Sequence, residues 1–169
     1  GAPHMTTDTT DLAAVQDRLW HEIKKRGGTG MLGLTGSGQH FQPMTAFVER
    51  EAGRMWFFTR KDADLVYDIG KGASAMFVFQ ADDLQACIGG GVTPTFDRDR
   101  MSRYWSPMVA AWYPEGKDDP ALTMLRMDCV DADGWISYPC LTKFAWETAK
   151  ANTTHQPPDL GGRAPIEFH

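Results

Sequence analysis

The glycine pattern Gly28-x-Gly30-x-x-Gly33 has a spacing that could bind a phosphate. In dinucleotide-binding proteins this pattern follows a strand and opens a helix, so that backbone N–H groups hold the pyrophosphate. Here it follows an expected helix and opens an expected strand. We therefore interpret it as a glycine-rich turn and not as a nucleotide site.

Motifs for metal binding, phosphate transfer and nucleophilic catalysis are incomplete in this chain. His21-Glu22 lacks the second histidine that a zinc-binding helix needs. Gly116-Lys117 is followed by an aspartate and not by the serine or threonine of a P-loop. Ser37 and Ser106 lack the Gly-x-Ser-x-Gly turn that exposes a nucleophilic serine. The sequence therefore predicts no metal site, and it leaves the catalytic residues unknown.

Aromatic side chains are the strongest remaining sign of a ligand or a partner. The chain of 169 residues has six tryptophans, nine phenylalanines and four tyrosines. Flat apolar side chains suit a flat ligand or a partner chain, although most tryptophans in proteins are core or interface anchors. Composition alone leaves these roles open.

The charge balance argues against binding nucleic acid by charge alone. The chain has 17 Lys+Arg and 22 Asp+Glu, a formal net charge of −5, whereas phosphate neutralisation needs a clustered basic surface. Its longest apolar stretches cover only a few residues, far short of the roughly 20 that span a bilayer. We expect a protein that binds neither nucleic acid nor membranes.

Cysteine use and chain length indicate the compartment and the number of domains. Cys87, Cys129 and Cys140 are too few and too scattered for a disulfide framework, so we interpret them as free thiols in a reducing cytoplasm. Residues 1–4, directly before Met5, resemble an expression scar. At about 150 residues per domain, residues 5–169 are expected to form one domain, with a helix and coil tail at about 140–169.

Short extended segments separated by turn residues dominate the middle of the chain. Hydrophobic periodicity predicts helices at residues 11–26, 63–69, 97–112 and 141–151, the third split or kinked by Pro107. Strands are expected at residues 29–35, 39–49, 54–59, 73–80, 84–95, 121–130 and 135–138, with a turn at 131–134. The predicted fold class is mainly β with α, a small barrel of six to seven antiparallel strands with flanking helices.

Gly89-Gly90-Gly91 interrupts an otherwise β-like segment and has two interpretations. It is either a bulge that lets a barrel strand bend, or a place where a ligand or a second backbone approaches closely. We favour the bulge, because glycine bends are common where small barrels turn corners.

A block of aromatic and turn residues resembles a family signature. It consists of Trp105-Ser106-Pro107 followed by residues 111–120, Ala-Trp-Tyr-Pro-Glu-Gly-Lys-Asp-Asp-Pro. Together with Pro43-Met44 and the largely aromatic residues 55–59, this order is similar to the general stress protein branch of the pyridoxamine 5'-phosphate oxidase-like, flavin-binding split barrels. The resemblance covers nearly the whole chain from Leu12 onward.

This resemblance implies a split β-barrel that forms a homodimer, with two flavin mononucleotide (FMN) sites at the subunit interface. The flat flavin ring needs apolar walls and backbone donors at its edge, and its phosphate needs cations or hydroxyls. The expected cofactor-binding residues are Gln42, Pro43, Met44, Thr45, Phe58, Thr59, Arg60, Lys61, Trp105 and Trp112. Three other tryptophans, Trp20, Trp56 and Trp135, are expected to pack in the core.

The expected phosphate end departs from the family pattern at three positions. Gln42 stands where family members often have arginine. Ala63 and Leu65 stand where they often have serine and lysine. A lost charge-assisted phosphate contact costs about 1.5–3 kcal/mol, so these departures would weaken phosphate binding considerably.

Charged residues near the expected phosphate would have opposite effects on its binding. Asp62 and Asp64 bring negative charge toward the expected phosphate. Arg60 and Lys61, in the adjacent turn, either compensate for the missing cations or are solvated loop charges. The sequence leaves both interpretations open.

Three functions are compatible with these residues. The first is an FMN-binding general stress protein, with activity as a flavin-dependent oxidoreductase between a reduced nicotinamide and a small acceptor. The second is a non-catalytic stress-response or ligand-binding dimer whose phosphate site is degenerate and which holds another flat small molecule or none. The third is a binder of the dinucleotide FAD, whose bridging phosphates need fewer contacts than a monophosphate.

Overall fold

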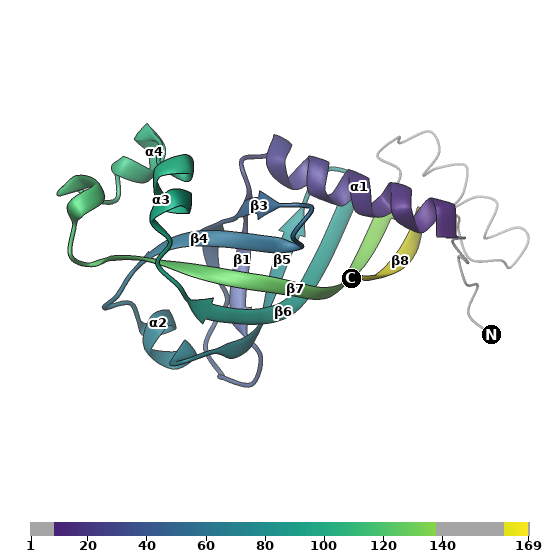
Figure 1. The fold of residues 1–169 in the computed structure, drawn as a ribbon. Coiled ribbons are helices and arrows are strands. Elements are labelled where there is room, and N and C mark those ends of the chain that lie inside the picture. Colours follow the sequence, from purple (N-terminus) through teal and green to yellow (C-terminus); the bar gives the residue numbers. More distant parts are fainter. Residues whose placement is uncertain (1–8, 138–160, 169) are drawn as a thin grey trace, which may run out of the picture.

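The computed structural model describes residues 9–137 and 161–168, which form an antiparallel sheet with helices around it (Figure 1). The strands are β1 (Thr29–Leu34), β2 (Gln42–Thr45), β3 (Phe47–Glu49), β4 (Arg54–Arg60), β5 (Ala73–Gln80), β6 (Leu84–Pro94), β7 (Leu122–Ser137) and β8 (Gly161–Glu167). The helices are α1 (Thr9–Lys25), α2 (Asp64–Ile69), α3 (Arg98–Tyr104) and α4 (Pro107–Ala110), with a 3₁₀ turn at Gly116–Asp118. The predicted mainly β fold with flanking helices is confirmed.

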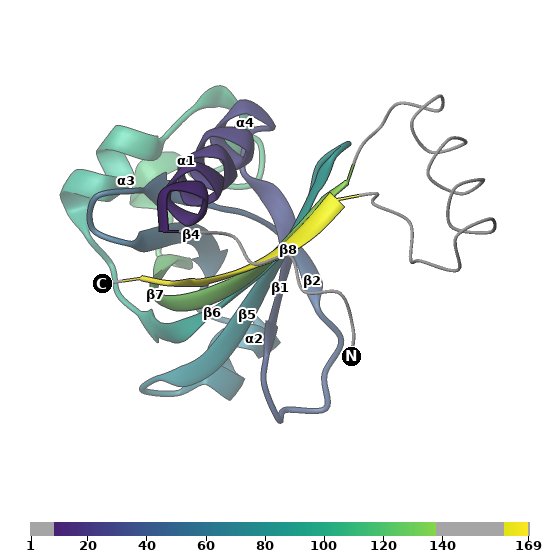
Figure 2. The same cartoon turned by 90° about the vertical axis from the view of Figure 1, so that its right-hand side faces the viewer.

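The sheet curls so that strands distant in its hydrogen-bonded order approach each other. The order is β2-β1-β5-β6-β7-β4-β3, all neighbouring pairs are antiparallel, and β8 pairs with the second half of β7. Figure 2 shows β8 lying along β7 on the curled sheet. β2 and β4 contact each other although no ladder joins them. The barrel is therefore split at a seam between β2 and β4.

Strand β4 separates two apolar clusters because it is buried on both faces. Met55 and Phe57 belong to the main core, where the ring centre of Phe57 lies 5.7 Å from that of Phe77 on β5. Trp56 and Phe58 belong to a second cluster shared with α3 and α4. Successive side chains of a strand point to opposite faces, so one strand holds two parts of the protein together.

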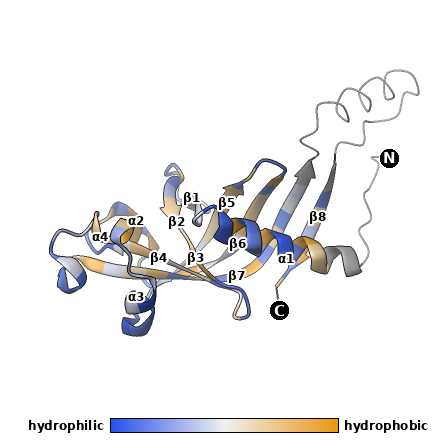
Figure 3. Cartoon of the chain, turned by 90° about the horizontal axis from the view of Figure 1, so that it is seen from above, coloured by the Kyte–Doolittle hydropathy of each residue, from blue (hydrophilic) through white to orange (hydrophobic). Residues whose placement is uncertain are grey.

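Helix α1 lies across the sheet and covers the main core (Figures 1 and 3). Leu19, Trp20 and Ile23 are almost fully buried beneath it, at the spacing of one helix face. The helix contacts both β3 and β8. None of the described helices combines the length and the apolar composition needed to cross a membrane.

Both interpretations of Gly89-Gly90-Gly91 apply, because these glycines of β6 lie opposite a bulge in β7 and the backbone of β7 approaches Gly90 closely. The register between β6 and β7 shifts between Gly89 and Gly90, which leaves Val130 of β7 without a partner on β6. A Cβ on Gly90 would lie 2.2 Å from the carbonyl oxygen of Asp128. Glycine at this position lets the two strands approach closely while β7 bends.

The expected single strand at residues 39–49 is wrong, because the chain turns a barrel corner within it. The N–H of Ala46 donates to the carbonyl oxygen of Gly28 at 2.8 Å, and this contact separates β2 from β3. β2 pairs with β1, whereas β3 pairs with β4. The segment thus belongs to two edges of the sheet.

Two expectations for the second half of the chain are also wrong. The expected turn at residues 131–134 is part of the continuous strand β7, because the bulge bends the strand without ending it. Within the expected coil tail, residues 161–167 form β8, because β7 offers them a ladder. The helix expected at residues 141–151 lies outside the described residues.

The tryptophans divide differently from the expectation. Trp20 and Trp56 are buried, as predicted. Trp135, expected in the core, is 42% exposed because it lies on the outward face of β7. The guanidinium of Arg163 lies 5.9 Å from its ring centre. The assignment of Trp135 to core packing is therefore wrong.

Glu49, at the end of β3, attaches α3 to the sheet. Its carboxylate accepts hydrogen bonds from Trp56 Nε1 at 3.0 Å, from Arg100 Nε at 3.1 Å and from the Tyr104 hydroxyl at 2.6 Å. Burial by itself would raise the pKa of Glu49, but these hydrogen bonds lower that pKa to about 2. The ring of Tyr104 stacks on Phe47 at 4.9 Å, so the carboxylate positions the second cluster.

We expect Gly90→Ala to lower the free energy of unfolding by about 1–3 kcal/mol, because the new methyl group would overlap the backbone of β7. The matched control is Gly91→Ala, since a Cβ there meets no atom within 4 Å. Urea denaturation of both variants measures the difference. Equal destabilisation of the two variants would contradict the close packing of β6 on β7.

Acid is expected to weaken the attachment of α3. A carboxylate with a folded-state pKa of about 2 stabilises the fold above its unfolded pKa, and this contribution disappears as the pH falls through the folded pKa. The contribution at neutral pH is on the order of 3 kcal/mol. Glu49→Gln should therefore be less stable than wild type at neutral pH, with a smaller loss on acidification from about pH 5 to pH 2. Urea denaturation across this pH range measures how the free energy of unfolding of wild type and of Glu49→Gln changes with pH. The same change in both proteins would contradict the assigned role of Glu49.

Candidate functional site

A pocket lies at the seam where β2 and β4 meet, beside α4. Its volume is about 580 Å³, within the range of small-molecule sites. Its lining comes from Thr29, residues 42–45, Phe47, residues 58–60, Asp62, Ala63, Met108, Val109, Trp112 and Tyr113. The curl of the sheet therefore brings segments from both ends of its strand order around one pocket.

The aromatic wall of the pocket is supported by the second cluster. Phe58 contacts Phe47 and Trp105 edge-on, with ring centres 5.6 Å and 6.0 Å apart. Trp105 also contacts Tyr113, at 6.1 Å between ring centres. Aromatic pairs at these distances stabilise each other beyond simple burial, so the wall is held in place before any ligand arrives.

The rim of the pocket carries apolar side chains that are open to solvent. Trp112 is 77% exposed and Met108 is 60% exposed, although both line the pocket. The hydroxyl of Ser106 accepts the N–H of Val109 at 3.3 Å and caps α4, and Pro107 occupies the first turn. The exposed apolar rim is typical of a surface that meets a ligand or a partner.

The polar end of the pocket lies where β4 ends. Arg60 Nε donates to Asp62 Oδ1 at 3.1 Å. Asp119 accepts the N–H of Ala121 at 2.9 Å, and its charge also acts on Arg60. The hydrogen bond and charge of Asp62, together with the charge of Asp119, raise the pKa of Arg60. The only cation among the described lining residues is thus already paired.

Tyr113 is the remaining titratable group in the described lining. Burial raises the pKa of Tyr113 to about 12, although the charge of Arg60 acts in the opposite direction. Its hydroxyl therefore remains protonated at neutral pH. Besides Arg60 and Tyr113, the described lining contains one carboxylate, Asp62, and no histidine, cysteine or glutamate.

Most residues predicted to bind a cofactor meet in this pocket. The eight that line it are Gln42, Pro43, Met44, Thr45, Phe58, Thr59, Arg60 and Trp112. Lys61 is exposed and outside the lining, and Trp105 lies behind Phe58. Their role in holding a cofactor stays a prediction.

The positions that depart from the family pattern have different surroundings. Ala63 lines the pocket, whereas Leu65 is buried in the main core at 4% exposure. Sequence reasoning missed Phe47, because its place in the pocket depends on the corner at Ala46. It also missed Tyr113, although the Trp-Tyr-Pro block that contains this residue was a usable signal.

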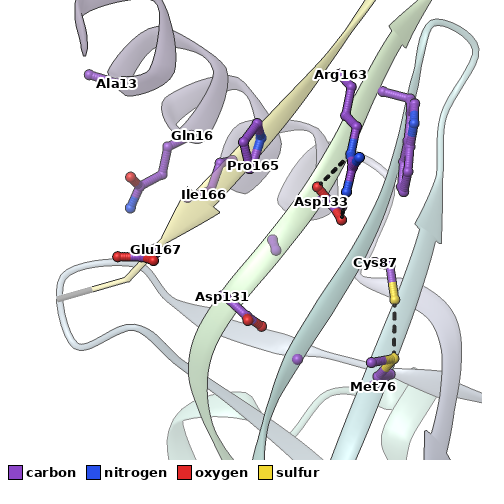
Figure 4. A pocket seen from close by; sticks show the side chains of 13 residues that line it. Ala13, Gln16, Met76, Cys87, Asp131, Asp133, Arg163, Pro165, Ile166 and Glu167 are labelled. Carbon is purple, nitrogen blue, oxygen red and sulfur yellow. Dashed lines mark hydrogen bonds and ion pairs between the residues drawn. The ribbon is translucent and has the colours of Figure 1, made fainter. Parts of the chain in front are cut away.

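A larger cavity of about 780 Å³ lies on the outer face of the sheet, beside α1 (Figure 4). Arg163 and Asp133 form an ion pair there, with Nη2 and Oδ2 2.7 Å apart. Cys87 Sγ lies 3.5 Å from Met76 Sδ, and burial raises the pKa of this thiol. None of the predicted cofactor-binding residues lines this cavity. Within residues 9–137 and 161–168, no group of three or more His, Cys, Asp or Glu side chains is arranged to hold a metal ion.

Comparison with solved structures finds the same fold in bacterial general stress proteins. A protein assigned to general stress protein 26 from Jannaschia sp. CCS1 is 29% identical with a TM-score of 0.74, and the match covers 93% of this chain and 99% of that one. A protein assigned to the general stress family from Xanthomonas campestris pv. campestris is 40% identical with a TM-score of 0.70, covering 78% and 92%. The general stress FMN/FAD binding protein from Xanthomonas citri is 38% identical with a TM-score of 0.70, covering 76% and 93%.

Comparison with protein families gives the same result. No curated protein matches the chain at a significant level. The model for pyridoxamine 5'-phosphate oxidase-like proteins, however, matches residues 15–159. This range begins within α1 and includes strands β1 to β7 and the Trp-Tyr-Pro block. The resemblance predicted from the sequence is confirmed, and the chain belongs to the pyridoxamine 5'-phosphate oxidase-like family.

Proposed function

We propose that this protein binds a flavin in the pocket between β2 and β4. The observation that carries the proposal is the meeting of eight predicted cofactor-binding residues around one largely apolar pocket. The Xanthomonas citri protein, described as FMN/FAD binding, is 38% identical to this chain. Its description supports a flavin as the ligand in preference to other flat molecules.

The walls of the pocket fit a flavin ring. Phe58 and Trp112 offer flat aromatic surface, and Met44 offers a polarisable thioether. β2 is an edge strand that pairs only with β1. Half of the backbone polar groups in such a strand face away from its ladder, so they are available to the polar edge of the ring.

The polar end of the pocket fits a phosphate less well than the walls fit the ring. The hydroxyls of Thr45 and Thr59 can serve as hydrogen-bond donors. Arg60 is paired with Asp62, and Gln42 supplies no charge. These contacts support binding through the ring and ribityl chain more than through capture of a phosphate dianion.

A bound flavin supplies hydride and electron transfer chemistry. The residues of this chain bind the ring, orient it and exclude water from its covered face. The described lining contains no histidine, cysteine or glutamate, so the geometry supports flavin binding without assigning a proton-transfer step. The expected oxidoreductase activity between a reduced nicotinamide and a small acceptor would require the nicotinamide to reduce the bound flavin, which anaerobic absorbance spectroscopy measures directly.

The proposed binding form is a homodimer. Trp112 and Met108 leave apolar surface exposed at the rim of the pocket. Exposed apolar surface of this kind is costly in water and typical of a ligand or partner site. A second copy of the chain would cover the rim and the open side of a bound flavin together.

We expect Trp112→Ala to weaken flavin binding about fivefold to tenfold, because the loss of one aromatic contact costs about 1–1.5 kcal/mol. The matched control is Trp135→Ala, which removes an exposed tryptophan from the outer face of the sheet. Quenching of flavin fluorescence on titration with protein gives both dissociation constants. Equal effects of the two substitutions would place the flavin outside the proposed pocket.

We expect sedimentation equilibrium at micromolar concentration to give the mass of a dimer. Trp112→Glu should shift the protein toward monomer, because a charge would be buried in the proposed interface. Tyr67→Glu is the control, since Tyr67 is 86% exposed on α2 and lies outside the pocket lining. A stable wild-type monomer would contradict the proposed dimer.

A further inference from the structure

The charge of the flavin pocket is unusual for a site that would hold a phosphate. Among its described lining residues, Arg60 is the only cation and Asp62 the only anion. Their side chains are 3.1 Å apart from Nε to Oδ1. The lining is therefore neutral as a whole, and Asp119 near Arg60 shifts the polar end further toward negative charge.

We propose that Asp62 sets the ligand specificity of this pocket by cancelling the charge of Arg60, so that the site binds a flavin with an uncharged end with an affinity within tenfold of its affinity for FMN. The inference rests on the proposed flavin binding and adds to it the chemical class of the ligand. Riboflavin carries the same ring and ribityl chain as FMN and lacks the phosphate. It is therefore the probe for the uncharged class.

Two consequences of charge support this specificity. A phosphate at the polar end would meet a cation that already donates to Asp62, and it would lie near the Asp62 carboxylate. Like charges separated by a few ångströms repel even in an aqueous environment. Riboflavin experiences neither effect, because its terminal group is an uncharged hydroxyl. The ring contacts with Phe58 and Trp112 are common to both ligands.

Asp62→Asn tests the role of the carboxylate. This substitution keeps the size of an exposed side chain, frees Arg60 and removes one negative charge. Asp68→Asn is the matched control, because it removes the same charge from an exposed position at the other end of α2. Thermal melting checks that both variants remain folded.

The experiment measures dissociation constants of riboflavin and FMN by fluorescence quenching at low ionic strength. We expect wild type to prefer FMN over riboflavin by less than tenfold. Asp62→Asn should tighten FMN binding at least tenfold and leave riboflavin binding within twofold, whereas Asp68→Asn should change neither. The gain for FMN should shrink in high salt, because ions screen the interaction.

A double variant shows whether the effect passes through Arg60. Adding Arg60→Gln to Asp62→Asn should abolish the gain in FMN affinity, because the freed guanidinium is its source. A wild-type preference for FMN of tenfold or more would overturn the inference about Asp62 and leave flavin binding intact. So would an equal response of both flavins to Asp62→Asn. Absence of binding to either flavin would overturn the proposed function, and this inference with it.

Discussion

The burial of β4 on both faces is the constraint on which the rest of the structure depends. Met55 and Phe57 fill the main core of the curled sheet, whereas Trp56 and Phe58 fill the second cluster with α3 and α4. A strand packed on two sides cannot move relative to either cluster without opening both. The two clusters are therefore mechanically coupled, and the end of β4 is a fixed point from which a binding site can be built.

The site uses the place where the barrel does not close. β2 and β4 contact each other without a ladder, so the seam leaves room for a ligand while its two sides stay anchored in the sheet. The aromatic side is held by Glu49, which attaches α3 and thereby supports Phe47 and Phe58. The polar end is governed by the pair Arg60 and Asp62. Shape thus comes from the curled sheet, and charge comes from the short turn that follows β4.

The sequence predicted those features whose signals are local. The short apolar segment at residues 73–80 predicted β5, and the Trp-Tyr-Pro block located the α4 side of the pocket. Features set by tertiary contacts were missed. The polar residues 131–134 resembled a turn but belong to a long strand that has partners on both sides. Phe47 was not predicted as a pocket residue, because only the corner at Ala46 directs this residue toward the pocket.

A crystal structure of the protein soaked with riboflavin tests the central claim most directly, since it locates the ring itself. The proposed site predicts ring density between β2 and α4, in contact with Met44, Phe58 and Trp112. The polar edge of the ring should form hydrogen bonds with the backbone groups of β2 that face away from β1. Density in the outer cavity beside Cys87 and Trp135, or no density at the seam in a crystal saturated with riboflavin, would contradict the claim that the split in the barrel is the flavin site.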